Sequence, residues 1–382
     1  MTHTAKTAVI VGYARTPFTP AHKGALVHTR ADDMAAAVVK ALLKRTKVKP
    51  ADVEDLIVGC AFPEGEQGFN VARLIGFLAG LPQGVAGMTV NRFCGSSLQA
   101  VQIAAGAIAT GAGEVFICAG VESMSRVPIG GFNPLPNPKL YEDMPEAYMG
   151  MGETAENVAK KFKISRADQD AFAVESQRKA GIAAAKGLLK DEIVPIETKH
   201  GTVTEDGCLR PDTTAAGLGD LKPAFDKDGS VTAGTSSPLT DGAAAVLVVS
   251  EEYAKKHKLP ILARIVSFAV SGCAPEIMGM GPVDATRKAL ERAGLKLKDI
   301  DIIELNEAFA AQSLGVARTL KLDMDKVNID GGAIALGHPL GATGARIVGK
   351  AASLLKRTKG NYALATQCIG GGQGIAMILE KA

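Results

Sequence analysis

Aromatic residues are scarce in this chain: tryptophan is absent and all aromatics together make up 4% of the residues. Proteins that stack nucleic-acid bases use aromatic platforms, so we expect no binding of this kind. An excess of one charge is also missing, because 43 basic and 40 acidic residues leave a formal net charge of +3. This balance gives no electrostatic reason to bind nucleic acid or an anionic membrane surface.

Long apolar runs and paired cysteines are missing as well. No uninterrupted apolar segment approaches the roughly 20 residues of a membrane helix, so we expect no membrane span. The N-terminal segment MTHTAKTAVIVGYARTPF lacks the features of a signal peptide. The six cysteines form no CxxC pair and no zinc-type spacing. Such cysteines are typical of a reducing compartment, so we expect a cytoplasmic protein.

What the chain does have is length, apolar residues and glycine. Its 382 residues are 47% hydrophobic, which is enough for a large core and more than one domain. The 43 glycines predict many tight turns or close backbone approaches.

The sequence also resembles itself at a long interval. The segment ALLKRTKVKPADVEDLIVG at 41–59 is matched by KALERAGLKLKDIDIIELN at 288–306, with an offset of 247 residues. Both segments have the pattern of a helix, a short loop and a buried strand. The same offset places the NRFCGSSLQA segment over the GHPLGATGAR segment. We interpret this as two related α/β halves produced by duplication, although helix–loop–strand segments also resemble one another by chance.

Residues 121–237 differ in character, being rich in proline, glycine and methionine at their start. One helix is expected at GETAENVAKKF, and another from Ser165, which forms a capping-type pair with Asp168, towards Lys186. The apolar segment 241–250 then predicts a strand that rejoins the first half. We therefore predict an N-terminal domain of residues 1–120 plus 238–258, an inserted loop domain of residues 121–237, and a C-terminal domain of residues 259–382.

Cys94 is the first candidate for chemistry. It follows a strand-like segment and precedes an apolar-periodic helix, so it is expected at a helix N-terminus, where the dipole favours a thiolate. A thiolate attacks carbonyl carbon. A free cysteine is also often just a small buried hydrophobic residue, and position alone does not decide between these roles.

His338 and Cys368 stand in the two most glycine-rich turns. His338 lies in GGAIALGHPLGATGAR, and histidine is the usual group that takes a proton from cysteine near neutral pH. Cys368 precedes a glycine cluster between two apolar runs, which predicts a hairpin whose exposed N–H groups can hold an oxyanion. The alternatives are an ordinary turn histidine and a merely flexible turn.

Asn306 begins NEAFAAQSLG directly after a strand-like segment. At a strand end its side chain can hold a water molecule or a carbonyl oxygen. Asparagine is equally suited to cap a helix, so this alternative stays open.

Taken together, NRFCGSSLQA, NEAFAAQ, GGAIALGHPLGATGAR and CIGGGQG stand in the order and positions of the thiolases, and the whole chain resembles that family. The resemblance implies an α/β thiolase fold: two similar layered α-β-α-β-α halves related by internal duplication, with an inserted loop domain that binds coenzyme A. It implies an acyltransferase that cleaves 3-ketoacyl-CoA with CoA, or runs the reverse Claisen condensation, through an acyl group carried on cysteine.

The resemblance also assigns roles by motif position. Cys94 would be the nucleophile, His338 would activate it, and Cys368 would protonate the departing acetyl-CoA carbanion. One oxyanion hole would use the N–H groups of Cys94 and Gly370, and the other would use His338 and a water held by Asn306. The matching positions for binding CoA and the acyl group are Ser237, Arg210, Phe225, Met151, Met278 and Phe309. Neither a metal nor a cofactor is implied, since coenzyme A is a substrate.

Two positions depart from thiolases specialised for acetoacetyl-CoA. Those enzymes commonly carry histidine just before the methionine at 151, where this chain has Gly150, and they read GSG where this chain reads GSS at 95–97. Both features resemble the degradative 3-ketoacyl-CoA thiolases of fatty-acid β-oxidation. The alternatives are a biosynthetic acetoacetyl-CoA thiolase, a ketoacyl synthase, against which the second cysteine argues, or a non-catalytic acyl-CoA-binding relative.

Partners are implied by the resemblance only. Thiolases are homodimers or homotetramers, so this chain is expected to self-associate. Degradative members can also join a hydratase–dehydrogenase subunit.

Overall fold

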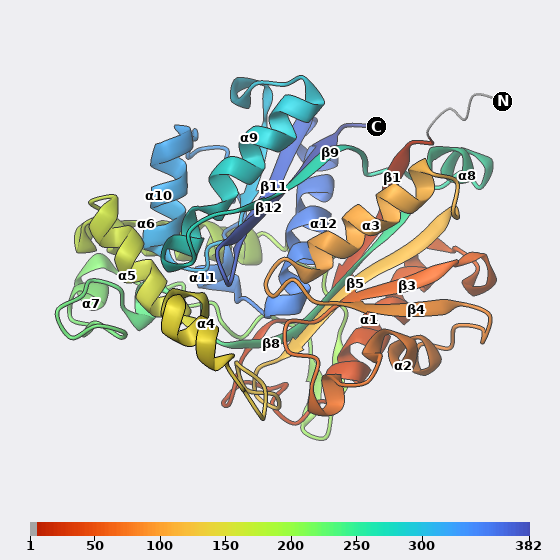
Figure 1. Cartoon of the computed structure of the whole chain (residues 1–382). Coiled ribbons are helices and arrows are strands. Elements are labelled where there is room, and N and C mark those ends of the chain that lie inside the picture. Colours follow the sequence, from red (N-terminus) through yellow and green to blue (C-terminus); the bar gives the residue numbers. More distant parts are fainter. Residues whose placement is uncertain (1–5) are drawn as a thin grey trace.

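The structure is a computed structural model that describes residues 6–382. In this part of the chain the strands form one ten-stranded mixed sheet and a separate two-stranded hairpin, with helices on both sides of the large sheet (Figure 1). The strands are β1 (Ala8–Arg15), β2 (Thr19–Pro20), β3 (Asp55–Gly59), β4 (Ala86–Val90), β5 (Val115–Ser123), β6 (Ile196–Thr198), β7 (Gly201–Val203), β8 (Thr240–Ser250), β9 (Ala263–Gly272), β10 (Ile302–Leu305), β11 (Tyr362–Ile369) and β12 (Gln373–Glu380).

The helices are α1 (Ala31–Thr46), α2 (Val71–Leu78), α3 (Ser96–Ala109), α4 (Pro138–Asp143), α5 (Met151–Lys161), α6 (Arg166–Ala185), α7 (Ala215–Gly219), α8 (Glu251–Lys256), α9 (Gly281–Ala293), α10 (Ala310–Leu320), α11 (Ala333–Leu336) and α12 (Leu340–Thr358).

The two halves of the large sheet have the same strand arrangement. In the first half, β8 lies antiparallel between β1 and β5, and β3 runs parallel to β5. In the second half, β12 lies antiparallel between β9 and β11, and β10 runs parallel to β11. The halves meet through a short antiparallel pairing of β1 with β9. This repeated topology confirms the predicted duplication.

The element boundaries repeat at the interval seen in the sequence. Helices α1 and α9 each end in a left-handed residue, Lys47 with φ 59° and Gly294 with φ 66°, and these two positions are 247 residues apart. The same offset separates the first residues of β5 and β11, Val115 and Tyr362. Because such details do not arise from chance similarity of short segments, the offset marks structurally equivalent positions.

The layers follow from where apolar residues are buried. Helices α3 and α12 pack on each other and bury their apolar faces against strands of both halves. Helix α1 covers the other side of the first half, and α9 covers the other side of the second. Strands β5 and β8 are buried along their whole length, as expected for strands covered on both faces. This is the predicted layered α-β-α-β-α arrangement.

The segment between β5 and β8 contains α4 to α7 and the β6–β7 hairpin. Its helix α6 begins as predicted: the Ser165 hydroxyl accepts the N–H of Asp168 at 3.1 Å, and the Asp168 carboxylate accepts the N–H of Ser165. Helices α5 and α6 contact α10 of the second half. The predicted domain boundaries within this arrangement stay a prediction.

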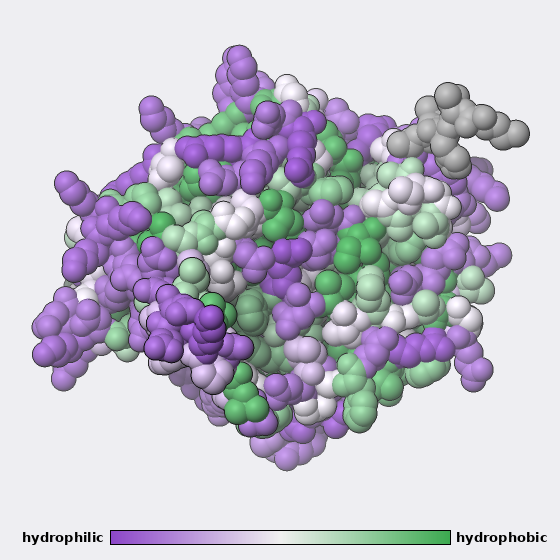
Figure 2. Space-filling view, in the orientation of Figure 1, coloured by the Kyte–Doolittle hydropathy of each residue, from purple (hydrophilic) through white to green (hydrophobic). Residues whose placement is uncertain are grey.

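Among the described helices, none is both long and apolar enough to cross a membrane. Figure 2 shows charged and polar residues over most of one face, with hydrophobic patches over the region of α3, β3 and β4. The expected absence of a signal peptide concerns in part residues 1–5, which lie outside the described residues.

Candidate active site

The starts of α3 and α12 approach each other closely because glycines stand where they meet. A Cβ atom on Gly120 would lie 2.1 Å from the Gly341 carbonyl oxygen, and one on Gly344 would lie 2.2 Å from the Leu98 nitrogen. Real side chains do not tolerate such distances, so only glycine permits this packing. The turn that carries Cys94 and the turn that carries His338 are thereby placed next to each other, at the starts of two packed helices.

Cys94 lies two residues before α3 and is 8% exposed. Burial raises the pKa of its thiol to about 12, although hydrogen bonds from the N–H groups of Gly370 and of Cys94 itself act in the opposite direction. The loss of hydration therefore outweighs the helix terminus and the two N–H groups that favour a thiolate, and burial favours the thiol form of Cys94. The thiol is protonated until a base removes the proton.

Cys368 lies at the end of β11 in the predicted hairpin, whose turn has Gly371 and Gly372 at φ 75° and 80°. The side chain is completely buried. Burial raises the pKa of Cys368 well above its usual value, and charge on Cys94 raises it further. The two sulfur atoms are therefore electrostatic neighbours, and Gly370 of the same turn presents its N–H to Cys94.

His338 is held in one tautomer by its neighbours. The Thr343 hydroxyl donates its only proton to the Pro339 carbonyl at 2.9 Å, so it accepts from His338 Nδ1, which lies 2.6 Å away. The proton is thus assigned to Nδ1, and Nε2 carries the lone pair. The backbone N–H of His338 donates to Thr240 Oγ1 at 3.0 Å, which fixes the position of the turn.

Burial lowers the pKa of His338 to about 3, and the nearby positive charge of Arg346 adds to this effect. The imidazole is therefore neutral at physiological pH. With Cys94 protonated, the resting site holds a neutral thiol and a neutral base.

Asn306 follows β10 and is completely buried. Its Nδ2 lies 3.3 Å from His338 Nε2, while its Oδ1 has no hydrogen-bond partner within residues 6–382. Helix α10 begins only at Ala310, so Asn306 does not cap it. The alternative of a helix cap is thus excluded, and a buried acceptor is left available beside His338.

Four of the predicted binding positions line one apolar region. Met278 and Phe309 are buried in the same cluster as Cys368, with Met151 packed at its edge. The Met151 sulfur would lie 3.5 Å from a Cβ atom on Gly370. The ring of Phe225 is 44% exposed and meets Phe309 edge-on, with 5.9 Å between the ring centroids.

Ser237 and Arg210 lie further out. The Ser237 N–H donates to the Ala308 carbonyl at 2.9 Å, so its loop is joined to the start of α10. Arg210 is exposed, and its backbone N–H donates to the side chain of Gln177 at 2.8 Å. Neither is hydrogen-bonded to the cysteines or the histidine within the described residues.

Sequence reasoning missed residues that position the site. Thr343 and Thr240 hold His338, and the buried Glu122 carboxylate accepts N–H groups of Gly341 at 2.9 Å and Ala61 at 2.8 Å. Thr343 stood within the glycine-rich run and so had a signal. Glu122 had none, because only the fold brings the end of β5 to the start of α12.

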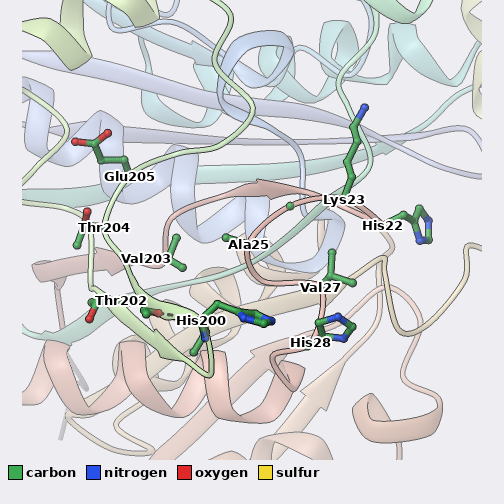
Figure 3. A pocket seen from close by; sticks show the side chains of 13 residues that line it. His22, Lys23, Ala25, Val27, His28, His200, Thr202, Val203, Thr204 and Glu205 are labelled. Atoms are coloured by element: carbon green, nitrogen blue, oxygen red, sulfur yellow. Dashed lines mark hydrogen bonds between the residues drawn. The ribbon is translucent and has the colours of Figure 1, made fainter.

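A surface pocket of about 610 Å³ lies elsewhere, lined by residues 22–28 and 198–205. Figure 3 shows that His22, His28 and His200 line it together with Lys23 and Glu205. None of the site residues named above, all within the described part of the chain, lines this pocket. The chemistry of the side chains, and not the size of a cavity, therefore locates the candidate site.

Comparison with protein families gives two matches that together span nearly the whole chain. The model described as thiolase, N-terminal domain, matches residues 8–252, and that described as thiolase, C-terminal domain, matches residues 259–381. The chain is 50% identical to the 3-ketoacyl-CoA thiolase of Bacillus subtilis, covering 98% of this chain and 99% of that protein. It is also 50% identical to the 3-ketoacyl-CoA thiolase of Aliivibrio fischeri, covering 98% and 100%.

Solved structures give the same result. Human mitochondrial 3-ketoacyl-CoA thiolase superimposes with a TM-score of 0.92 at 42% identity, covering 99% of both chains. The same human enzyme in complex with CoA gives 0.91, and the acetyl-CoA acetyltransferase of Bacillus anthracis gives 0.91 at 38% identity, each covering 100% of both chains. With the motifs, the fold and these comparisons in agreement, the chain belongs to the thiolase family.

Proposed function

We propose that this protein is an acyltransferase that cleaves 3-ketoacyl-CoA with coenzyme A, giving acetyl-CoA and an acyl-CoA shortened by two carbons. The observation that carries this proposal is the setting of Cys94: its thiol is hydrogen-bonded by the N–H of Gly370 and lies beside a second buried thiol, Cys368. A nucleophile, an oxyanion donor and a proton donor are thus adjacent. The relatives named 3-ketoacyl-CoA thiolase support the same substrate class.

In the first half-reaction, His338 Nε2 takes the proton of Cys94, and the sulfur attacks the 3-keto carbon. The N–H groups of Cys94 and Gly370 hold the resulting oxyanion. The bond between C2 and C3 then breaks and its electron pair forms the enolate of acetyl-CoA. Cys368 donates its proton to C2, which leaves an acyl thioester on Cys94 and a thiolate at Cys368.

In the second half-reaction, the Cys368 thiolate takes the thiol proton of an incoming CoA. The CoA sulfur attacks the thioester, and Cys94 leaves as a thiolate that recovers its proton from His338. Both cysteines and the histidine return to their starting states.

The enolate oxygen needs its own stabilisation. Once His338 has gained a proton at Nε2, it can donate a hydrogen bond. The free Oδ1 of the buried Asn306 accepts from a water that donates to the same oxygen. The low pKa of His338, about 3, makes its protonated form a strong donor.

For CoA, we assign the pantetheine to the region of Ser237, Met278 and the Phe225–Phe309 pair, and the nucleotide end to the exposed Arg210. Phe225 is half-exposed above the buried Phe309, which suits an apolar ligand surface. A solved relative that is described in complex with CoA supports CoA binding in general.

We favour substrates longer than acetoacetyl-CoA, as in fatty-acid degradation. Gly150 precedes Met151, and the nearest atoms to a Cβ at Gly150 belong to the Glu153 carboxyl group, from 3.6 Å. Position 150 therefore places no imidazole beside Met151, and a longer acyl group is favoured. A protein specialised for acetoacetyl-CoA is the second candidate, favoured by the structural match to an acetyl-CoA acetyltransferase.

The test is CoA-dependent cleavage of acetoacetyl-CoA and 3-ketohexadecanoyl-CoA by the purified protein. Turnover of both substrates is expected. Turnover of acetoacetyl-CoA alone would favour the second candidate, and turnover of neither by folded protein would contradict the proposed function.

Self-association is part of the proposal. Strand β4 is one of the two end strands of the large sheet among the described residues, and Met88 on β4 and Phe77 and Leu78 of the α2 helix are 37–48% exposed. Natural proteins rarely leave such an edge uncovered. We expect a homodimer or a tetramer of dimers by light scattering. A hydratase–dehydrogenase subunit as a further partner is testable by mixing the two purified proteins.

A further inference from the structure

Phe93, directly before the nucleophile, has an unusual backbone conformation. Its φ of 42° lies in the left-handed region, which bulky residues seldom adopt and which persists only where the surroundings enforce it. Here the Phe93 N–H donates to Asn91 Oδ1 at 2.9 Å, and the Ser96 hydroxyl donates to the Phe93 carbonyl at 2.6 Å. The fold thus holds the backbone of Phe93 in one conformation directly before Cys94.

The ring of Phe93 borders the oxyanion site. Its Cδ2 atom would lie 3.5 Å from a Cβ on Gly370, and the Met151 sulfur lies at the same distance from that position. The ring is nevertheless 38% exposed, although Cys94 next to it is buried. Phe62 stands beside Phe93, with 5.9 Å between the ring centroids. A pair of aromatic rings is therefore left partly open at the edge of the nucleophile's surroundings.

We infer that Phe93 and Phe62 form the wall that receives the acyl chain beyond the reacting carbon, and that this wall sets the preference for long chains. The inference rests on the proposed function. When the carbonyl oxygen of the acyl group on Cys94 lies at the Gly370 N–H, the first carbons of the chain must pass the groups that flank Gly370. Those groups are Met151 and Phe93. Aromatic rings bury much apolar surface and suit saturated chains.

Exposed apolar side chains also lie over the loop that follows Phe62, where the Glu64 carboxylate accepts the Phe132 N–H at 2.6 Å. Phe132 lies over Gly65, three residues after Phe62, with its ring 2.9 Å from where a Cβ on Gly65 would stand. Gly65 has φ 54°, and Phe132 is 61% exposed, with the neighbouring Leu135 81% exposed. Phe132 thus adds exposed apolar surface against the loop that carries Phe62, which suits a chain of many methylenes better than the short acetoacetyl group.

The experiment compares wild type, Phe62→Ala and Phe93→Leu on acetoacetyl-CoA and 3-ketohexadecanoyl-CoA. Phe62→Ala is the main variant, because Phe62 is part of the wall but is distant in sequence from the strained backbone next to Cys94. Phe69→Ala is the matched control, since that ring is 95% exposed and lies outside the wall. We expect kcat/KM for the long substrate to fall about tenfold or more in Phe62→Ala and Phe93→Leu. We expect the value for acetoacetyl-CoA to stay within about twofold in Phe62→Ala and to fall less than the long-chain value in Phe93→Leu, and we expect the control to be unchanged on both.

An equal fall in kcat/KM for both substrates, or no fall for either, would contradict the inferred role of Phe62 and Phe93. If Phe62→Ala changed the oligomeric state but left the chain-length preference unchanged, these aromatic rings would be assigned to contact with a second copy of the chain instead. The kcat/KM values of the wild type test the proposed function. The ratios of kcat/KM between the variants and the wild type test the role of the wall. Wild-type turnover of acetoacetyl-CoA alone would leave the thiolase chemistry standing and remove the wall.

Discussion

Thr343 Oγ1 accepts a hydrogen bond from His338 Nδ1 at 2.6 Å while donating its own proton to the Pro339 carbonyl. This single contact decides which ring nitrogen of the histidine is a base. With Nδ1 protonated, Nε2 carries the lone pair, and it lies 3.3 Å from Asn306 Nδ2. Thr343 thus sets which nitrogen of His338 can accept a proton.

Replacing Thr343 with valine should therefore impair catalysis. The variant keeps the shape of the side chain but loses the acceptor, so the Nδ1–H is left buried and the other tautomer becomes accessible. We expect kcat to fall about 10- to 100-fold with KM little changed. Thr343→Ser, which restores the hydroxyl, should recover most of the activity. Equal activity of the valine variant and wild type would contradict the assigned tautomer.

Much of the fold was predictable because it depends on residues that are close together in the sequence. The offset of 247 residues placed α1, α9, β3 and β10 correctly, since helix periodicity and left-handed helix ends depend on nearby residues. The Ser165–Asp168 capping pair and the glycine turn after Cys368 were visible for the same reason. Glu122 was invisible, because its role arises only where two distant chain segments meet.

The electrostatics of the site were not predictable either. Position at a helix start favoured a thiolate at Cys94, whereas burial raises its pKa to about 12. Burial depends on the packing of α12 and the β11–β12 hairpin around that turn, so no sequence window contains it.

Cys368→Ala should separate the two half-reactions. Carbon–carbon cleavage needs the Cys368 proton, so cleavage of 3-ketohexadecanoyl-CoA should fall by at least about 100-fold. Transfer of an acyl group from butanoyl-CoA to Cys94 expels the CoA thiolate, which can leave without a proton from Cys368, so the acylated protein should still form and be visible by mass spectrometry. Loss of both reactions in folded protein would show that Cys368 supports Cys94 instead of donating the proton.

His338 should make the protein less stable in acid. Burial lowers its pKa from 6.5 to about 3, so the unfolded chain binds the proton more readily and stability is lost as pH falls from about 6.5 towards 3. By about pH 5 the loss is about 2 kcal/mol. Urea denaturation midpoints of wild type and His338→Gln at about pH 7.5 and 5 measure this. The variant should show a smaller shift, and an equal shift would exclude His338 as the cause.

Arg15 should hold the inserted segment to the first half. This fully buried guanidinium pairs with Glu192 at 2.8 Å and Asp206 at 2.6 Å. Arg15→Met leaves buried carboxylates short of a partner and should reduce stability by about 3–5 kcal/mol, measured by urea denaturation. The control is Arg178→Met, which removes an exposed pair with Glu175 and should cause no measurable change. Similar midpoints for both variants would contradict this role for Arg15.

The most direct test of the account is to find the acyl group itself. The protein is mixed with 3-ketohexadecanoyl-CoA in the absence of free CoA, quenched in acid, and analysed by intact and peptide mass spectrometry, with Cys94→Ala in parallel. The account predicts a tetradecanoyl thioester on the peptide containing Cys94, release of acetyl-CoA in equal amount, and disappearance of the label when CoA is added. A folded protein that releases acetyl-CoA without labelling Cys94, or that labels another cysteine in both wild type and variant, would contradict it.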